Sequence, residues 1–194
     1  MADYQLDYEA MNENGGEKPK NSVGEELFEW IETIIFGFFV MILFFTFVFR
    51  IANVDGPSMI PTLINGEKLV VSYHFYTPDN GDIVIVKAGA LNKLIVKRVI
   101  ATAGQTVDID FAAGTVSVDG VVLDEPYVNT PTTLDEGAFD YPVTVPEDCV
   151  FVMGDNRNDS ADSRDPRVGF VRTDDVMGKV VLRLTPINKF GTVH

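Results

Sequence analysis

The stretch "GDIVIVKAGALNKLIVKRVIATAG", residues 81–104, decides the fold class. It holds two runs rich in Val and Ile, separated by a short segment of Gly, Ala and Asn, which is typical of strands bounded by turns. Further runs of this kind lie on both sides of it: "KLVVSY", "TVDIDF", "TVSVDGVVL", "CVFVMGD" and "GKVVLRL". Residues 53–194 are therefore predicted to form an all-β domain, in which Asp119-Gly120 makes a type I′ hairpin turn.

Upstream of these strands lies the longest apolar run of the chain, "TIIFGFFVMILFFTFVF", residues 33–49. It carries no charge for about 17 residues, near the lower limit for crossing a bilayer. Trp30 and Arg50 at its ends can extend the span by anchoring and snorkelling. Ser22 and Glu25 form a capping box, which places the start of the helix near Val23. Residues 23–52 are predicted to be a single transmembrane helix.

Two other interpretations of the apolar run are less favoured. A cleavable signal peptide would need a basic segment before the run, whereas "EELFEWIE" precedes it. A buried core helix that is apolar on all sides would need a larger protein around it. Residues 1–22, which are polar and acidic, are predicted to be a disordered tail.

Charge and cysteine content limit the partners and cofactors. The formal charge is −14 and the isoelectric point is about 4.4, with no block of Lys and Arg to neutralise phosphates, so nucleic acid is not an expected partner. Cys149 is the only cysteine, which excludes an internal disulfide, and its strand-like context predicts an inert buried thiol. No zinc-ligand spacing is present, and "GDNRNDSADSR" fails the EF-hand pattern at Arg157. No metal and no cofactor are predicted.

A candidate nucleophile stands in "GPSMIPTL", residues 56–63. By itself the segment is better explained as a rigid loop, because prolines fix φ on both sides of Ser58. The roughly nine residues after Phe49 span at most ~30 Å, so Ser58 is predicted to lie close to the membrane surface.

A nucleophilic serine needs a base, and two side chains are candidates. Strand alternation places Lys97 on the same face as Ile95 and Val99, where desolvation disfavours the charged ammonium. A neutral Lys97 can take a proton from Ser58. The alternative is that Lys97 is an ordinary lysine on an edge strand, where its charge discourages aggregation, as we expect for Lys93. His74 in a Ser-His-Asp arrangement is the other candidate base.

Four motifs in order, "SMIPTL", "GDIVIVK", "KRVIATAG" and "GDNRNDSADSR", follow the apolar run. In this set the chain resembles the type I signal peptidases, bacterial Ser-Lys membrane peptidases. The resemblance implies that Ser58 attacks the scissile carbonyl and that Lys97 is the general base. It also implies supporting roles, in which Ser160 orients the Lys97 amine, Asp162 pairs with Arg164 beneath it, and Asp155 supports the same network.

The resemblance further implies the substrate and its contacts. The substrate would be a preprotein whose signal peptide is cut after an Ala-x-Ala sequence, in shallow apolar pockets that the family builds at the positions of Val54, Leu63 and Val96. Met59 would pack beside the site. Gly56 stands where many members carry a hydroxyl that helps to form the oxyanion hole. The enzyme would be a single-pass protein of the cell membrane, with a cytoplasmic N-terminus, a catalytic domain outside the cytoplasm and phospholipid around its helix.

Two other functions and one structural question stay open at this point. A catalytically weak relative could serve as an assembly factor for surface structures, although such relatives typically lose the serine or the lysine. A self-cleaving repressor-type peptidase shares the β fold, but this chain lacks a DNA-binding helical domain. The aromatic residues Tyr73, Phe75 and Tyr76 belong either to the core or to the membrane interface.

Overall fold

The computed structural model describes residues 23–73 and 76–193, without the side chain of Glu25. The predicted acidic tail, the Ser22–Glu25 capping box, His74 and Phe75 therefore lie outside the described residues. The chain divides into two compact units, with the boundary between Phe45 and Thr46. We describe each unit by itself.

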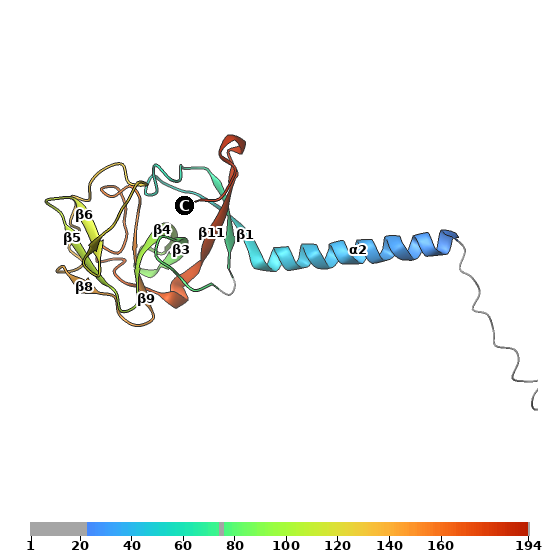
Figure 1. The fold of residues 1–194 in the computed structure, drawn as a ribbon, viewed down its shortest axis with the longest axis horizontal. Coiled ribbons are helices and arrows are strands. Elements are labelled where there is room, and N and C mark those ends of the chain that lie inside the picture. Colours follow the sequence, from blue (N-terminus) through green and yellow to red (C-terminus); the bar gives the residue numbers. More distant parts are fainter. Residues whose placement is uncertain (1–22, 74–75, 194) are drawn as a thin grey trace, which may run out of the picture. The chain divides into compact units, whose positions relative to one another are not determined.

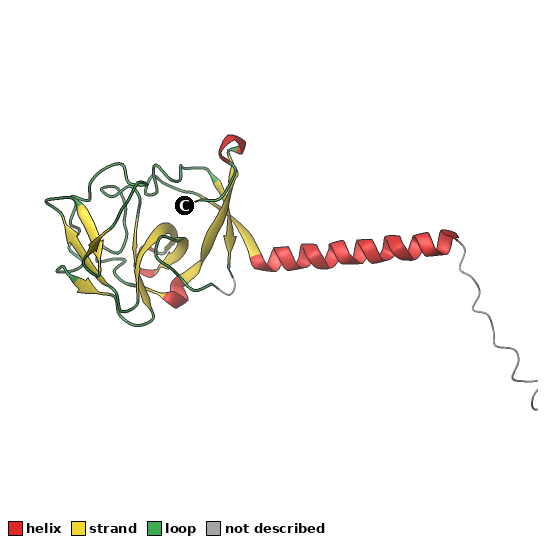
Figure 2. Ribbon diagram, in the orientation of Figure 1, coloured by secondary structure: helices red, strands yellow, loops and turns green. Residues whose placement is uncertain are grey.

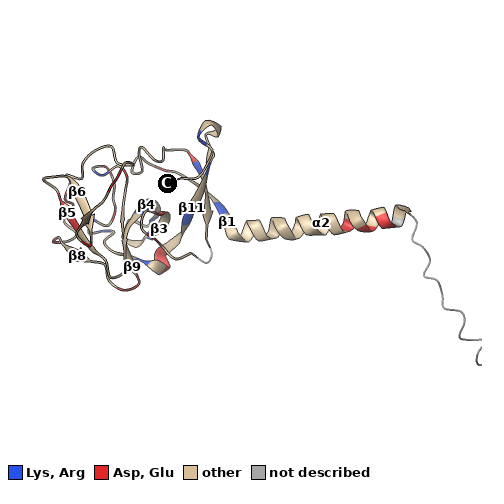
Figure 3. Ribbon diagram, in the orientation of Figure 1, with Lys and Arg blue, Asp and Glu red and all other residues tan. Residues whose placement is uncertain are grey.

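The first unit consists of most of helix α2, Val23–Val48, which is the predicted apolar helix. Its acidic side chains stand near its beginning, and the rest of it is uncharged (Figure 3). By length and composition, the segment Glu26–Val48 is able to cross a membrane. The helix ends at Val48 rather than at the predicted residue 52, because residues 49–53 pair with residues 68–72 as strands of the β domain.

The β domain contains two antiparallel sheets (Figures 1 and 2). The larger sheet has seven strands in the order β1-β2-β11-β3-β4-β9-β10, and the smaller has four in the order β7-β6-β5-β8. The bounds of the larger sheet's strands are Phe49–Asn53 (β1), Lys68–Ser72 (β2), Ile83–Ala88 (β3), Lys93–Thr102 (β4), Cys149–Met153 (β9), Val171–Arg172 (β10) and Val176–Thr185 (β11). The smaller sheet contains Thr106–Asp110 (β5), Thr115–Val118 (β6), Val121–Val122 (β7) and Val143–Thr144 (β8). Short 3-10 helices lie at Gly89–Leu91, Thr173–Asp175 and Ile187–Lys189.

Every run predicted as a strand from its Val and Ile content is a strand. The hairpin between β6 and β7 turns at Asp119 and Gly120, whose φ angles of 51° and 78° are both positive, as a type I′ turn requires. Strands β8 and β10 escaped prediction because each has only two residues and no alternating pattern. The Cys149 thiol lies in β9 and is half-buried rather than buried.

Three apolar clusters fill the β domain. One joins the smaller sheet to β9 through residues such as Val107, Val116 and Phe151. The other two lie on opposite faces of the β3–β4 pair, because neighbouring residues of a strand point in opposite directions. Ile85, paired with Val96, belongs to one cluster, whereas Val84, paired with Lys97, belongs to the other.

The described members of the aromatic group contact the core. The ring of Tyr73 packs against the cluster of Ile85, and that of Tyr76 packs against the cluster of Val84. The Tyr76 hydroxyl donates a hydrogen bond to Asp82 at 2.6 Å. Of the two possibilities left open, packing against the core is the one found for Tyr73 and Tyr76.

Candidate active site

Two buried apolar residues anchor the loop that carries Ser58 in the core. Met59 and Leu63 stand one helical turn apart, joined by a hydrogen bond from Leu63 N to Met59 O at 2.8 Å, and both are buried in the cluster of Ile85. Their burial leaves the neighbouring Ser58 half-buried at the rim of a groove. Gly56 has a φ of +98°, which favours glycine, and its N–H donates to Asn65 Oδ1.

Asn156 fixes the backbone on which Ser58 stands. Its N–H donates to Ser58 O at 3.0 Å, and its side-chain amide donates to Pro57 O at 3.2 Å. Asn156 belongs to the "GDNRNDSADSR" motif, but its residue type gave no reason to predict a role for it from sequence. Its contacts join the loop after β9 to the loop after β1, about 100 residues apart in the chain.

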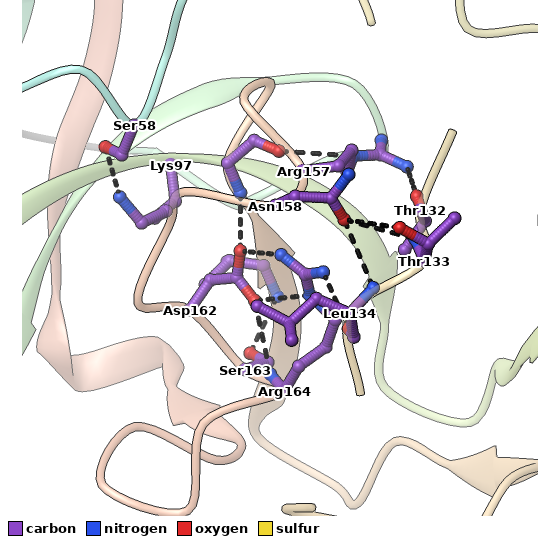
Figure 4. A network of polar contacts seen from close by, with 12 residues as sticks. Ser58, Lys97, Thr132, Thr133, Leu134, Arg157, Asn158, Asp162, Ser163 and Arg164 are labelled. Carbon is purple, nitrogen blue, oxygen red and sulfur yellow. Dashed lines mark hydrogen bonds and ion pairs between the residues drawn. The ribbon is translucent and has the colours of Figure 1, made fainter. Parts of the chain in front are cut away.

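Lys97 points at Ser58. Its Nζ donates hydrogen bonds to Ser58 Oγ at 2.7 Å and to Val96 O at 2.9 Å (Figure 4). Regular pairing with β3 keeps Lys97 on the face of β4 that carries Ile95, as the alternation predicted. The side chain is only 2% exposed, and this desolvation lowers the pKa of Lys97 from 10.5 to about 8, against the opposing attraction of the Asp162 carboxylate. A substantial share of this amine is therefore neutral near pH 8.

Ser160 does not make the contact expected of it. Its Oγ is buried and has no hydrogen-bond partner among the residues that the structure describes, so the predicted bond to Lys97 is absent. The hydrogen bonds of the Lys97 amine go to Ser58 and to the backbone instead. Gly154 allows the close approach of this region, because a Cβ there would overlap Ser160 Oγ and Ser58 O.

Asp162 and Arg164 form the expected pair. The guanidinium donates to both carboxylate oxygens, at 2.9 and 2.8 Å, and both side chains are buried (Figure 4). Asp162 also accepts the N–H of Gly154 at 2.9 Å. The pair thus ties the end of β9 to the turn that carries Ser160.

Asp155 belongs to a different network from the one expected. It accepts two hydrogen bonds from Arg98, at 2.8 and 2.7 Å, and a third from the Thr62 hydroxyl. Arg98 in turn stacks on the ring of Tyr127, 3.8 Å from its centre. Arg98 directly follows Lys97 in β4, and Thr62 lies four residues after Ser58. Asp155 therefore connects the strand that carries Lys97 to the loop that carries Ser58.

A third buried arginine attaches the long segment after β7. Arg157, fully buried, donates to Thr132 Oγ1 (Figure 4). It also donates to both oxygens of Glu125 and to Gly154 O. This segment has no regular structure between residues 123 and 142. These charge-assisted bonds therefore help to hold the segment against the loop after β9.

The groove beside Ser58 has a volume of about 550 Å³ and lies entirely within the β domain. It is lined by residues 51–59, by residues 93–97 of β4 and by residues 159–161, together with Tyr73 and Ile85. Val54, Gly56, Met59 and Val96 line it, as expected. Leu63 does not, because it is fully buried in the core below the loop.

The backbone along one wall of the groove has an unpaired edge. Strand β9 pairs with β4 only from Arg98 onward, so residues 93–97 have β3 on one side and no described strand on the other. Such an edge can accept an extended peptide as an additional strand. His74, the other candidate base, lies outside the described residues, and no group of three metal-binding side chains occurs in residues 23–73 and 76–193.

Comparison with known proteins agrees with this geometry. The sequence profile of the family described as "Signal peptidase, peptidase S26" matches residues 27–185. "Signal peptidase I" of Leptolyngbya laminosa is 35% identical over 176 residues, covering 85% of this chain and 83% of that protein. "Signal peptidase I" of Bacillus licheniformis is 36% identical over 192 residues, covering 92% of this chain and 97% of that protein. The chain therefore belongs to the signal peptidase family, peptidase S26, and is a serine endopeptidase.

Proposed function

We propose that this protein removes N-terminal signal peptides from exported preproteins, cutting after small-x-small sequences such as Ala-x-Ala. The observation that carries the proposal is the 2.7 Å hydrogen bond between Lys97 Nζ and Ser58 Oγ, made by a lysine that is almost fully buried. A serine beside an uncharged amine is an activated nucleophile. The groove beside the two residues supplies room for an extended peptide.

The proposed reaction uses the two side chains twice. Neutral Lys97 takes the proton of Ser58 Oγ as this oxygen attacks the scissile carbonyl, and the resulting ammonium gives the proton to the leaving amine. The signal peptide is then held as an ester of Ser58. A water molecule, deprotonated by Lys97, attacks the ester, and the proton returns to Ser58 as the peptide leaves.

Backbone and apolar groups near Ser58 support the binding of this substrate. The N–H of Ser58 is the donor proposed for the developing oxyanion, since Pro57 has none and the N–H of Gly56 is engaged by Asn65. Val54, Met59 and Val96 present apolar surface next to the dyad, which suits small side chains. We propose that the Asp162–Arg164 pair and Asp155 hold the loops in this arrangement.

We further propose that α2 crosses the membrane once, with the N-terminus in the cytoplasm and the β domain outside it. The uncharged length of the helix supports the crossing, and the place where signal peptides emerge supports the orientation. Protease treatment of intact cells and of inverted vesicles tests it. Degradation of the β domain only in inverted vesicles would contradict the proposed orientation.

The function is tested with the full chain in micelles of detergent and phospholipid, using a preprotein with an Ala-x-Ala site. Ser58→Ala and Lys97→Ala should each abolish cleavage while circular dichroism stays unchanged. Lys87→Ala, which removes an exposed lysine from the neighbouring strand β3, should cleave normally. Sequencing of the product N-terminus locates the cut. Turnover by either dyad variant, or a folded but inactive parent chain, would overturn the proposal.

The assembly-factor alternative is not favoured. Both the serine and the lysine are present and in contact. The compared relatives that share most of their length with this chain carry the name signal peptidase I.

A further inference from the structure

The groove holds a second lysine besides the proposed base. Lys93 lines the groove at the first position of β4, four residues before Lys97. Regular pairing with β3 from Lys93 to Arg98 keeps both lysines on one face of the strand. At about 3.3 Å per residue, Lys93 lies roughly 13 Å from Lys97 along the groove.

The Lys93 ammonium is available to a ligand. The residue is exposed, and its side chain makes no ion pair or hydrogen bond with any side chain that the structure describes. Lys93 is also one of the charges that lower the pKa of Lys97, which agrees with a position on the same side of the strand. Of the two lysines that line the groove among the described residues, Lys97 is buried and Lys93 is exposed.

The remaining charged residues of the groove do not neutralise Lys93 directly. Asp55 and Asp159 both line the groove and are exposed, and neither forms an ion pair with a described lysine. Asp159 adjoins Ser160 in the chain. The described lining of the groove therefore contains two exposed carboxylates and one exposed ammonium, and the ammonium has no ion-pair partner among the described residues.

A substrate bound as proposed would place a defined part of its chain next to Lys93. The scissile carbonyl has to lie beside Ser58, and the small residues before it beside Val54 and Val96. A peptide extended along the unpaired edge of residues 93–97 advances by about one residue for each residue of β4. The fourth or fifth residue before the cleavage site then lies next to Lys93.

We propose that Lys93 is a specificity-determining residue, which favours substrates with an acidic side chain four or five residues before the cleavage site and disfavours those with a basic one. The proposal rests on the proposed signal-peptide cleavage. It concerns a position beyond the small residues next to the cut.

The test uses the full chain in micelles of a non-ionic detergent with zwitterionic phospholipid at low salt. Three sets of Ala-x-Ala peptides carry Glu, Gln or Lys at one position from the fourth to the sixth residue before the cut, and kcat/KM is measured for each. The enzymes are the parent, Lys93→Gln, Lys93→Glu and, as the matched control, Lys87→Gln. Ratios between peptides are compared within each enzyme, so a change in the basicity of Lys97 affects all peptides alike and cancels.

The parent should prefer Glu to Gln and Gln to Lys by about 2- to 5-fold each at the fourth or fifth position, the range of an exposed charge pair. Lys93→Gln should bring the ratios close to one, Lys93→Glu should invert them, and Lys87→Gln should leave them at the parent values. Salt should reduce the preference.

Three results would overturn the inference. Equal ratios in the parent and in Lys93→Glu would show that Lys93 does not contact the substrate, while cleavage itself, and with it the proposed function, would stand. An effect of the Lys93 variants only with anionic phospholipid, on all peptides alike, would assign the lysine to a lipid headgroup. Failure of the parent to cleave any peptide would refute the proposed function and this inference together.

Discussion

Replacing Lys97 by Met should stabilise the fold near neutral pH while removing the proposed base. Methionine matches the length of lysine and carries no charge into the buried site. The lowering of the pKa of Lys97 from 10.5 to about 8 corresponds to a penalty of about 3 kcal/mol on the protonated folded state. The lysine is 2% exposed, so solvent does not relieve this penalty.

The pH window of the effect follows from the two pKa values. Below pH 8, lysine is protonated in both the folded and the unfolded chain, and the folded protein bears the full penalty. Between pH 8 and 10.5 the folded state loses its proton first, so the stability of the parent rises with pH, and above 10.5 the penalty is gone. The hydrogen bonds that Met cannot make, to Ser58 and to Val96 O, lower the variant's stability by a nearly constant amount.

The quantity to measure is the free energy of unfolding of Lys97→Met minus that of the parent. Guanidinium unfolding of the full chain in non-ionic detergent, followed by circular dichroism at pH 7, 9 and 11, gives this difference. It should fall by about 3 kcal/mol from pH 7 to 11. Lys87→Met, at an exposed site, should show a flat difference. A flat or rising difference for Lys97→Met would refute the desolvation argument and, with it, the basis for a neutral lysine.

Three further predictions concern the same region. The kcat/KM of the parent should rise about tenfold per pH unit up to pH 8 and then level off, because neutral Lys97 is the reactive form. A rise that continues to about pH 10.5, the ordinary pKa of lysine, would contradict this prediction. Asp155→Asn should lower the free energy of unfolding by about 3 kcal/mol, since it leaves Arg98 buried without its carboxylate, while the exposed Asp174→Asn should stay within about 0.5 kcal/mol in the same guanidinium titration. Gly154→Ala should reduce kcat by about 100-fold with unchanged circular dichroism, because the added Cβ displaces the backbone carbonyl of Ser58. A near-normal kcat would show that the loops of Gly154 and Ser58 can move apart without loss of activity.

Much of the fold follows from local patterns. Val- and Ile-rich runs between turn residues are strands because β-branched side chains fit a pleated, half-buried surface, and the long uncharged run is a helix. Residues 49–52 were predicted as the end of the helix because they complete and directly follow the apolar run. Phe49–Asn53 is a strand because it pairs with Lys68–Ser72, and that partner is not visible in local sequence.

The sequence alone determined which residues are candidates for chemistry, because alternation placed Lys97 on an apolar face and the motif set singled out Ser58. Only the tertiary structure decided how they are connected. It put Lys97 Nζ 2.7 Å from Ser58 Oγ across 39 residues of chain and buried Leu63 beneath the loop. It paired Asp155 with Arg98 and left Ser160 Oγ with no hydrogen-bond partner among the described residues. The reason is physical: periodicity reports the face on which a side chain lies, whereas the partner of a buried polar group depends on which distant loops the packed sheet brings together.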